Sequence, residues 1–170
     1  MSESSHLEGE SLVRHRLREA VVGETSILDV GCGPGKYLNK LNVPVRVGID
    51  AHGPYLDRLN AQSIHGRAED VLPTLADLSF GTVIALDFIE HLEKPAALRV
   101  IAAMQRIARN QVLVFTPMGF QENRSKFSGV EQELQTHRSG WKSDDLGALG
   151  FSVEKWPDFD NGALWAVWAR

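Results

Sequence analysis

The chain has few of the residues that mark several protein classes. Its single cysteine, Cys32, excludes an internal disulfide framework and is typical of a reducing compartment, so we expect a cytoplasmic protein. No apolar run approaches the roughly 20 residues that a membrane-spanning helix needs. Residues 1–10 are polar and acidic and lack the apolar region of a signal peptide. The sequence therefore predicts no membrane association.

The chain also lacks an excess of basic residues. Lys and Arg number 18 against 22 Asp and Glu, which gives a formal net charge of −4. No basic stripe and no added RNA-binding module is visible, so nucleic acid is not the expected partner. A length of 170 residues fits one domain with a sizeable core. We expect a flexible N-terminus over residues 1–8 and a single domain over 9–170.

Apolar runs bounded by turn residues alternate with segments of helical periodicity. Amphipathic spacing and end signals predict helices near residues 9–22, from Lys36, at 55–59, from Pro95 and from Ser143. The alternation predicts an α/β fold, a Rossmann-like, mostly parallel sheet with helices on both faces. A short Asp/Asn/Gly connection joins the last two strands, so the last strand should be antiparallel. The seven predicted strands are Ser26–Val30, Val43–Ile49, Ser63–His65, Thr82–Leu86, Gln111–Phe115, Phe151–Trp156 and Ala163–Ala169.

Three glycines, Gly31, Gly33 and Gly35, follow the first predicted strand. A strand, a glycine loop and a helix start bring backbone N–H groups close to a ligand, and a Cβ there would clash with the ligand or forbid the turn. A tight turn without a ligand is the alternative, which three glycines in five positions disfavour. Asp29, just before the loop, is placed to receive a ligand ammonium group. Asp50, at the end of the second strand, suits the two hydroxyls of a ribose.

Several motifs in order resemble the class I S-adenosylmethionine-dependent methyltransferases, over about residues 25–156. They are L-D-V-G-C-G-P-G (28–35), V-G-I-D (47–50), G-R-A-E-D-V (66–71), A-L-D-F-I-E-H-L (85–92) and V-L-V-F-T-P (112–117). The resemblance implies S-adenosyl-L-methionine as cofactor. Arg67 departs from the family, which commonly has Asp there, and an arginine cannot accept a hydrogen bond from adenine. The implied cofactor-binding residues are Asp29, Gly31, Cys32, Gly33, Gly35, Asp50, Ala51, Ala68, Glu69, Asp87 and Phe88.

An oxygen or nitrogen acceptor must lose a proton on methylation, and histidine is the natural base near neutral pH. His91 follows Glu90 directly after the fourth strand, where parallel sheets bind ligands. His137 lies in residues 117–142, which lack clear periodicity and are predicted to form a lid over the acceptor, named here the acceptor loop. We predict His137, or His91, as the catalytic base, with Glu90 orienting it.

The same residues offer a second interpretation. Asp87, Glu90 and His91 are spaced i, i+3 and i+4, so a helical turn would place them on one side, where His137 can join them around one divalent ion. The set resembles the site of magnesium-dependent O-methyltransferases of ubiquinone biosynthesis and of small-RNA 3′ ends, although Asp87 stands where those enzymes have Glu. Trp141 follows His137 in their H-x-x-x-W pattern and is assigned to the acceptor loop rather than to the core.

The favoured function is transfer of a methyl group from S-adenosylmethionine to an oxygen or nitrogen of a small molecule. A divalent-metal-assisted O-methyltransferase, with Mg²⁺ or Mn²⁺ and a quinone precursor, glycan or RNA 2′-hydroxyl as acceptor, is an alternative. An inactive cofactor-binding module and an NAD-dependent oxidoreductase are two more. The oxidoreductase is disfavoured because the third glycine comes one position too early for G-x-G-x-x-G. The inactive module is disfavoured because it has no need of both His91 and His137.

Overall fold

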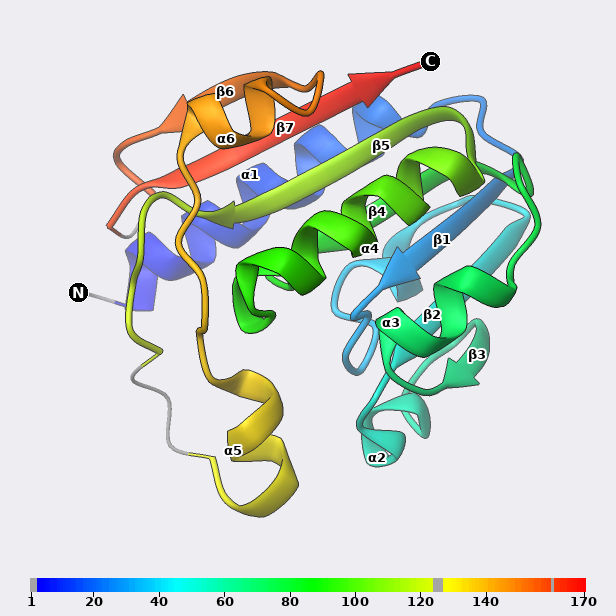
Figure 1. Ribbon diagram of the computed structural model, residues 1–170, viewed down its shortest axis with the longest axis horizontal. Helices are drawn as coiled ribbons and strands as arrows, with labels where there is room; N and C mark the ends of the chain where they lie inside the picture. The colour runs from blue at the N-terminus through cyan, green and yellow to red at the C-terminus, as the bar shows by residue number, and fades with distance from the viewer. Residues whose placement is uncertain (1–2, 124–126, 160) are drawn as a thin grey trace.

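The computed structural model describes residues 3–123, 127–159 and 161–170 (Figure 1). Its strands form one seven-stranded sheet. They are β1 (Ser26–Val30), β2 (Val45–Asp50), β3 (Gln62–His65), β4 (Phe80–Leu86), β5 (Ala108–Pro117), β6 (Ser152–Trp156) and β7 (Ala163–Ala169).

The strand order is β3-β2-β1-β4-β5-β7-β6. The strands from β3 to β5 pair in parallel, whereas β7 pairs antiparallel with both β5 and β6. This confirms the mostly parallel sheet and its antiparallel last strand, because a short connection between β6 and β7 allows only an antiparallel pair. From β1 the chain continues to β2 and β3 on one side of the sheet, and from β4 it continues to β5 on the other side. Parallel sheets bind ligands beyond the carboxyl ends of strands at such a reversal.

Helices cover both faces of the sheet, as predicted (Figure 1). Val13 and Leu17 of α1 pack with Ile27 on one face, while Ile101 and Met104 of α4 belong to the core on the other face. Alternate residues of the buried strands supply the two cores. The helical segments are α1 (Glu3–Ala20), η1 (Leu38–Lys40), α2 (Gly53–Leu56), α3 (Ala68–Val71), η2 (Leu72–Thr74), η3 (Ile89–His91), α4 (Lys94–Ile107), α5 (Gly129–Gln135) and α6 (Ser143–Gly147).

The first helix is longer than its apolar spacing predicts. It begins at Glu3 and so includes residues 3–8, which the sequence assigned to a flexible segment, while residues 1–2 lie outside the described part. The apolar repeat starts only at Leu12, but no proline precedes it to interrupt a helical backbone. The helix ends at Ala20, two residues before the predicted end, and Gly23 follows with a φ of 80°. Within the described residues, no helix has the length and apolar character to cross a membrane.

The acceptor loop is more ordered than predicted. It contains the helix α5, which lies apart from the layers that cover the sheet (Figure 1). Residues 124–126 of the loop lie outside the described part. The spacing of Val130 and Leu134, i and i+4, was the available signal for this helix.

Candidate active site

A cavity lies beyond the carboxyl ends of β1, β2 and β4, beside the point where the strand order reverses. Two walls enclose it. The first wall follows the carboxyl ends of the strands, and the second wall comes from the acceptor loop. The second wall includes Glu133, Leu134 and Gln135 of α5, together with Arg138. The first wall includes the predicted residues Gly31, Gly33, Asp50, Ala51, Ala68, Glu69, Asp87 and Phe88.

The glycine loop leaves β1 by turning toward β2. The N–H groups of Gly31 and Cys32 both donate to the carbonyl of Ile49, at 2.9 and 3.0 Å. A Cβ on Gly31 would lie 2.1 Å from Cδ2 of Phe88, so a glycine is needed for that ring to pack there. A Cβ on Gly33 would meet no atom within 4 Å. Gly31 therefore makes room for a wall residue, whereas Gly33 leaves its backbone open at the cavity.

Asp50 stands at the cavity edge with a fixed carboxylate. One oxygen, Oδ2, accepts a hydrogen bond from the Gly33 N–H at 2.8 Å, and Oδ1 accepts one from the His52 N–H at 2.8 Å. These bonds orient the side chain and tie the end of β2 to the glycine loop. Asp50 lines the cavity, and its contact with a ribose stays a prediction.

Three of the predicted cofactor residues, Asp29, Cys32 and Gly35, do not line the cavity. Asp29 is buried, and its burial raises the pKa of the carboxyl to about 8. Cys32 packs against Gly48, where an added Cβ would lie 2.6 Å from Sγ. Gly35 makes room for Asn39, whose amide would lie 2.6 Å from an added Cβ. Packing accounts for Cys32 and Gly35, and direct contact of all three with a cofactor stays a prediction.

The short helix η3 places Glu90 and His91 after β4. Glu90 is 2% exposed, and its Oε2 accepts a hydrogen bond from Oγ1 of Thr116 at 2.9 Å. Burial, and then the charge of Asp87, raises the pKa of Glu90 to about 8. This shift favours the protonated carboxyl near neutral pH.

The acceptor loop brings His137 against His91. Their rings meet edge to face, with centroids 4.8 Å apart. Nδ1 of His137 donates to the carbonyl of Gln121 at 2.6 Å, which leaves Nε2 as the acceptor nitrogen. Burial lowers the pKa of both histidines, and burial together with His137 lowers that of His91 to about 4. Both imidazoles are therefore neutral near pH 7.

Glu90, His91 and His137 form one cluster, which we call the Glu–His–His cluster. Their ligand atoms lie within 4.8 Å of one another. Nδ1 of His91 is buried and has no hydrogen-bond partner among the residues that the structure describes. Asp87 is not part of the cluster, because the helical turn is a single 3₁₀ turn that begins only at Ile89. Asp87 has a φ of 53° and lines the cavity instead.

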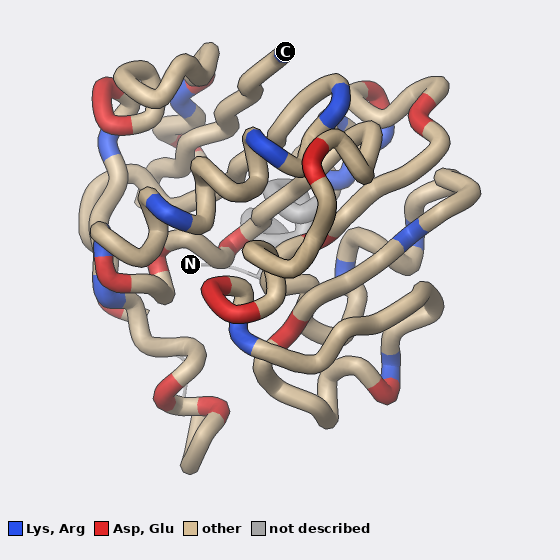
Figure 2. The backbone as a smooth tube through the Cα atoms, turned by 45° about the vertical axis from the view of Figure 1, so that its right-hand side comes forward, with Lys and Arg blue, Asp and Glu red and all other residues tan. Residues whose placement is uncertain are grey.

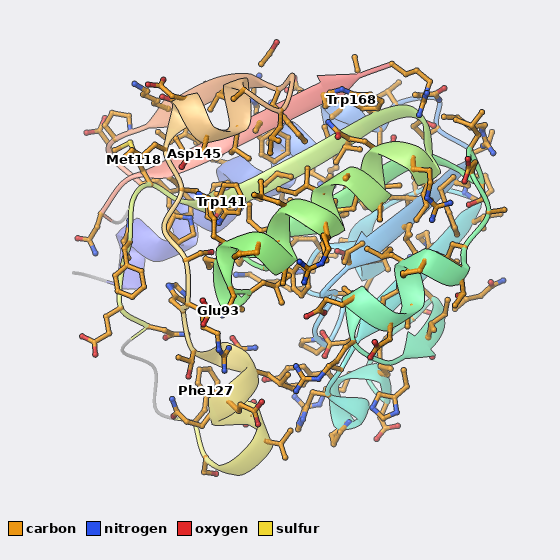
Figure 3. The ribbon with its side chains drawn as sticks, viewed as in Figure 1. Glu93, Met118, Phe127, Trp141, Asp145 and Trp168 are labelled. Atoms are coloured by element: carbon orange, nitrogen blue, oxygen red, sulfur yellow. The ribbon has the colours of Figure 1, made fainter. Side chains whose placement is uncertain are left out.

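Trp141 is a core residue, so the prediction that it lies outside the core is wrong. It is fully buried, and its Nε1 donates to Oγ of Ser139 at 3.1 Å. Nζ of Lys94, at the start of α4, lies 3.5 Å from the ring centroid of Trp141. Figure 3 labels Trp141 beside α4. Bridges to Met118 and Gly119 hold the backbone of Trp141 beside the end of β5.

The unusual Arg67 has a partner in the acceptor loop. Its Nη2 donates to Oε1 of Glu133 at 3.2 Å, so the two cavity walls are joined by an ion pair. The hydroxyl of Tyr55, in α2, makes a second polar contact with the acceptor loop, at Glu131. The sequence did not indicate these pairs, because their members are far apart along the chain.

A comparison with protein families gives one match. The family described as "Methyltransferase domain" matches residues 28–116, more than half of the chain. No curated protein matches significantly.

Many solved structures share the fold. N-methyltransferase NodS from Bradyrhizobium japonicum WM9 is 14% identical over 99% of this chain and 98% of that one, with a TM-score of 0.71. Magnesium protoporphyrin IX methyltransferase (ChlM) from Synechocystis PCC 6803, with bound SAH, is 16% identical over 98% and 86%, with a TM-score of 0.69. The methyltransferase domain of a bacterial Hen1 is 17% identical over 96% and 100%, with a TM-score of 0.64.

At these identities the structural neighbours show the fold, and the family match shows the relationship. The matched residues include the glycine loop, Asp50 and η3, the parts that form the first cavity wall and two members of the Glu–His–His cluster. The chain therefore belongs to the methyltransferase-domain family, as a member of the S-adenosylmethionine-dependent class that its motifs indicate.

Proposed function

We propose that the protein transfers a methyl group from S-adenosylmethionine to an oxygen or nitrogen atom of a small-molecule acceptor. The observation that carries the proposal is the contact between the two parts of the site. His91 lines the cavity and also belongs to the Glu–His–His cluster. A methyl donor in the cavity would therefore lie next to groups able to take a proton from an acceptor.

The cavity wall suits the parts of the proposed cofactor. The open backbone at Gly33 leaves space for the amino-acid tail, and the fixed carboxylate of Asp50 offers acceptors to ribose hydroxyls. Ala68 and Glu69 would flank the adenine. Asp87 and Phe88 would bound the cofactor on the side of β4.

In methyl transfer the cofactor supplies the reactive group, so the protein has to orient the acceptor and provide a base for its proton. The acceptor atom forms a bond to the methyl carbon while the bond from that carbon to sulfur breaks, so that S-adenosylhomocysteine leaves. The acceptor proton passes to His137 or His91, which are both neutral near pH 7. Glu90 would orient the histidines as a buried carboxylic acid, held in place by Thr116.

A divalent ion is the second candidate for the Glu–His–His cluster. Two observations favour the ion. Three ligand atoms lie within 4.8 Å of one another, and the buried Nδ1 of His91 has no hydrogen-bond partner in the described part of the chain. Mg²⁺ or Mn²⁺ held there would place an acceptor hydroxyl beside the methyl donor. Titration with Mn²⁺, followed by its electron paramagnetic resonance signal, tests this. Binding by the wild type and its loss in Glu90→Gln would support the ion, whereas no binding by the wild type would exclude it.

A small-molecule acceptor is favoured over RNA. Among the described residues in the view of Figure 2, Lys and Arg are spread among Asp and Glu and do not form one continuous stripe. Nucleic-acid binding needs such a stripe. A cytoplasmic location stays a prediction, which is supported by the single cysteine.

Calorimetric titration with S-adenosylhomocysteine tests the proposed function, with NAD as the control ligand. We expect micromolar binding of the first and no binding of the second. Binding of NAD alone, or of neither ligand, would overturn the proposal. Acceptors would then be screened with and without Mg²⁺ or Mn²⁺.

A further inference from the structure

Arg138 connects the acceptor loop to the two halves of the site. Its side chain donates three hydrogen bonds, all to backbone carbonyls. Nη1 donates to the carbonyls of His91 and Thr136, at 2.9 and 3.3 Å, and Nη2 donates to the carbonyl of Glu133 at 2.7 Å. One guanidinium therefore reaches η3, the loop around His137 and the helix α5.

The backbone of Arg138 also forms a hydrogen bond with η3. The N–H groups of Arg138 and Ser139 both donate to the carbonyl of Glu90, at 2.8 and 3.0 Å. The carbonyls of both Glu90 and His91 are thus bound by the residue that follows His137. These contacts fix the spacing of the Glu–His–His cluster through the backbone.

The bond to Glu133 acts on α5. Carbonyls in the last turn of a helix have no partner within the helix, and a cationic side chain there satisfies them and stabilises the helix end. The residues of that turn, Glu133, Leu134 and Gln135, form the second wall of the cavity. Arg138 is therefore bonded both to the wall that faces the cofactor and to the turn that carries His91.

We propose that Arg138 is a positioning residue for methyl transfer, which holds α5 over the cofactor cavity and His91 against His137. The inference rests on the proposed function, because it assumes a cofactor in the cavity. Arginine suits the task because its planar group has five donors in a fixed fork, whereas lysine presents one flexible ammonium. A lysine cannot span three carbonyls that belong to different segments.

The first experiment compares Arg138→Lys with a matched control, Arg106→Lys. Arg106 also donates to backbone carbonyls, those of Leu75 and Leu72 at 2.8 and 2.9 Å, but it does not line the cavity. Calorimetry with S-adenosylhomocysteine should show binding weaker by about tenfold or more in Arg138→Lys, the scale of a lost charged hydrogen bond. Arg106→Lys should bind as the wild type does.

Two further measurements separate positioning from general stability. Hydrogen exchange at residues 129–135 with bound ligand should be faster in Arg138→Lys and unchanged in Arg106→Lys. In Arg138→Ala, added guanidinium ion should restore part of the affinity, whereas ammonium ion should not. If Arg138→Ala does not fold, Arg138→Lys decides the question.

The outcomes distinguish the two levels of the proposal. A wild-type protein that does not bind S-adenosylhomocysteine refutes the proposed function itself. A wild type that binds, with Arg138→Lys indistinguishable from Arg106→Lys in affinity and exchange, overturns the role of Arg138 alone.

Discussion

Gly33 gives a sharp test of whether the glycine loop is a cofactor site or only a turn. Its φ is 52°, in the left-handed region, and a Cβ built on it meets no protein atom within 4 Å. Alanine at this position therefore adds no clash to the folded protein. The only cost to folding is the left-handed conformation, about 1–2 kcal/mol for a residue with a Cβ.

The cost to ligand binding has a different origin. Gly33 lines the cavity, so the added methyl group would occupy space that the cofactor needs. Overpacking by one methyl group costs about 1–3 kcal/mol, which weakens binding roughly 5- to 150-fold. We therefore expect Gly33→Ala to fold with a small loss of stability and to bind S-adenosylhomocysteine at least about 5-fold more weakly.

Gly23→Ala is the matched control. Gly23 has a φ of 80° and equally open surroundings, but it lies at the end of α1 and does not line the cavity. Urea denaturation should show similar losses of unfolding free energy in both variants, and calorimetry should show weaker binding only in Gly33→Ala. Equal affinities in the two variants would refute the assignment of Gly33 to the cofactor site.

Three further predictions concern charged and basic residues of the site. The folded pKa of Glu90, about 8, lies above its ordinary value of 4.5, so the folded protein binds this proton more tightly than the unfolded chain. Stability should therefore fall as the pH rises from about 5 to 8, and Glu90→Gln should flatten that fall in urea denaturation; an unchanged slope would contradict the shift. Asp29 contributes in the same direction, so the slope should not vanish. His137→Ala should lower turnover by roughly 100-fold on an identified acceptor and leave S-adenosylhomocysteine affinity nearly intact, because His137 does not line the cavity. Unchanged turnover would exclude it as the base. Asp50→Ala should weaken cofactor binding by about 1.5–3 kcal/mol, and wild-type affinity in calorimetry would rule out the ribose contact.

Local patterns were enough to predict the sheet and the first cavity wall. Buried strands such as Ser26–Val30 are short apolar runs between turn residues, and the observed β1 has the same bounds. The short connection between β6 and β7 decided their antiparallel pairing. The sequence pointed to Gly31, Gly33 and Asp50 as residues of this wall because glycines directly after a strand, and an acid at a strand end, are visible in the local sequence.

Some expectations were wrong because the same local sequence pattern is compatible with two different structures. The i, i+3, i+4 spacing of Asp87, Glu90 and His91 would place all three together in an α-helix, but the turn is a short 3₁₀ helix that starts after Asp87. Trp141 has polar and glycine neighbours along the chain and yet packs into the core beside Lys94, where bridges join its backbone to Met118 and Gly119.

The sequence by itself determined the fold class and the family, and it pointed to residues of the first cavity wall, because strand runs, turn glycines and ordered motifs can be recognised without their distant contacts. The tertiary structure decided how the acceptor loop closes the site. Arg138 bonds to the carbonyl of His91, 47 residues away, and Thr116 bonds to Glu90, 26 residues away. No periodicity or spacing encodes such pairs, since the packing of the whole sheet brings them together and a single arginine or threonine carries no signal of its distant partner.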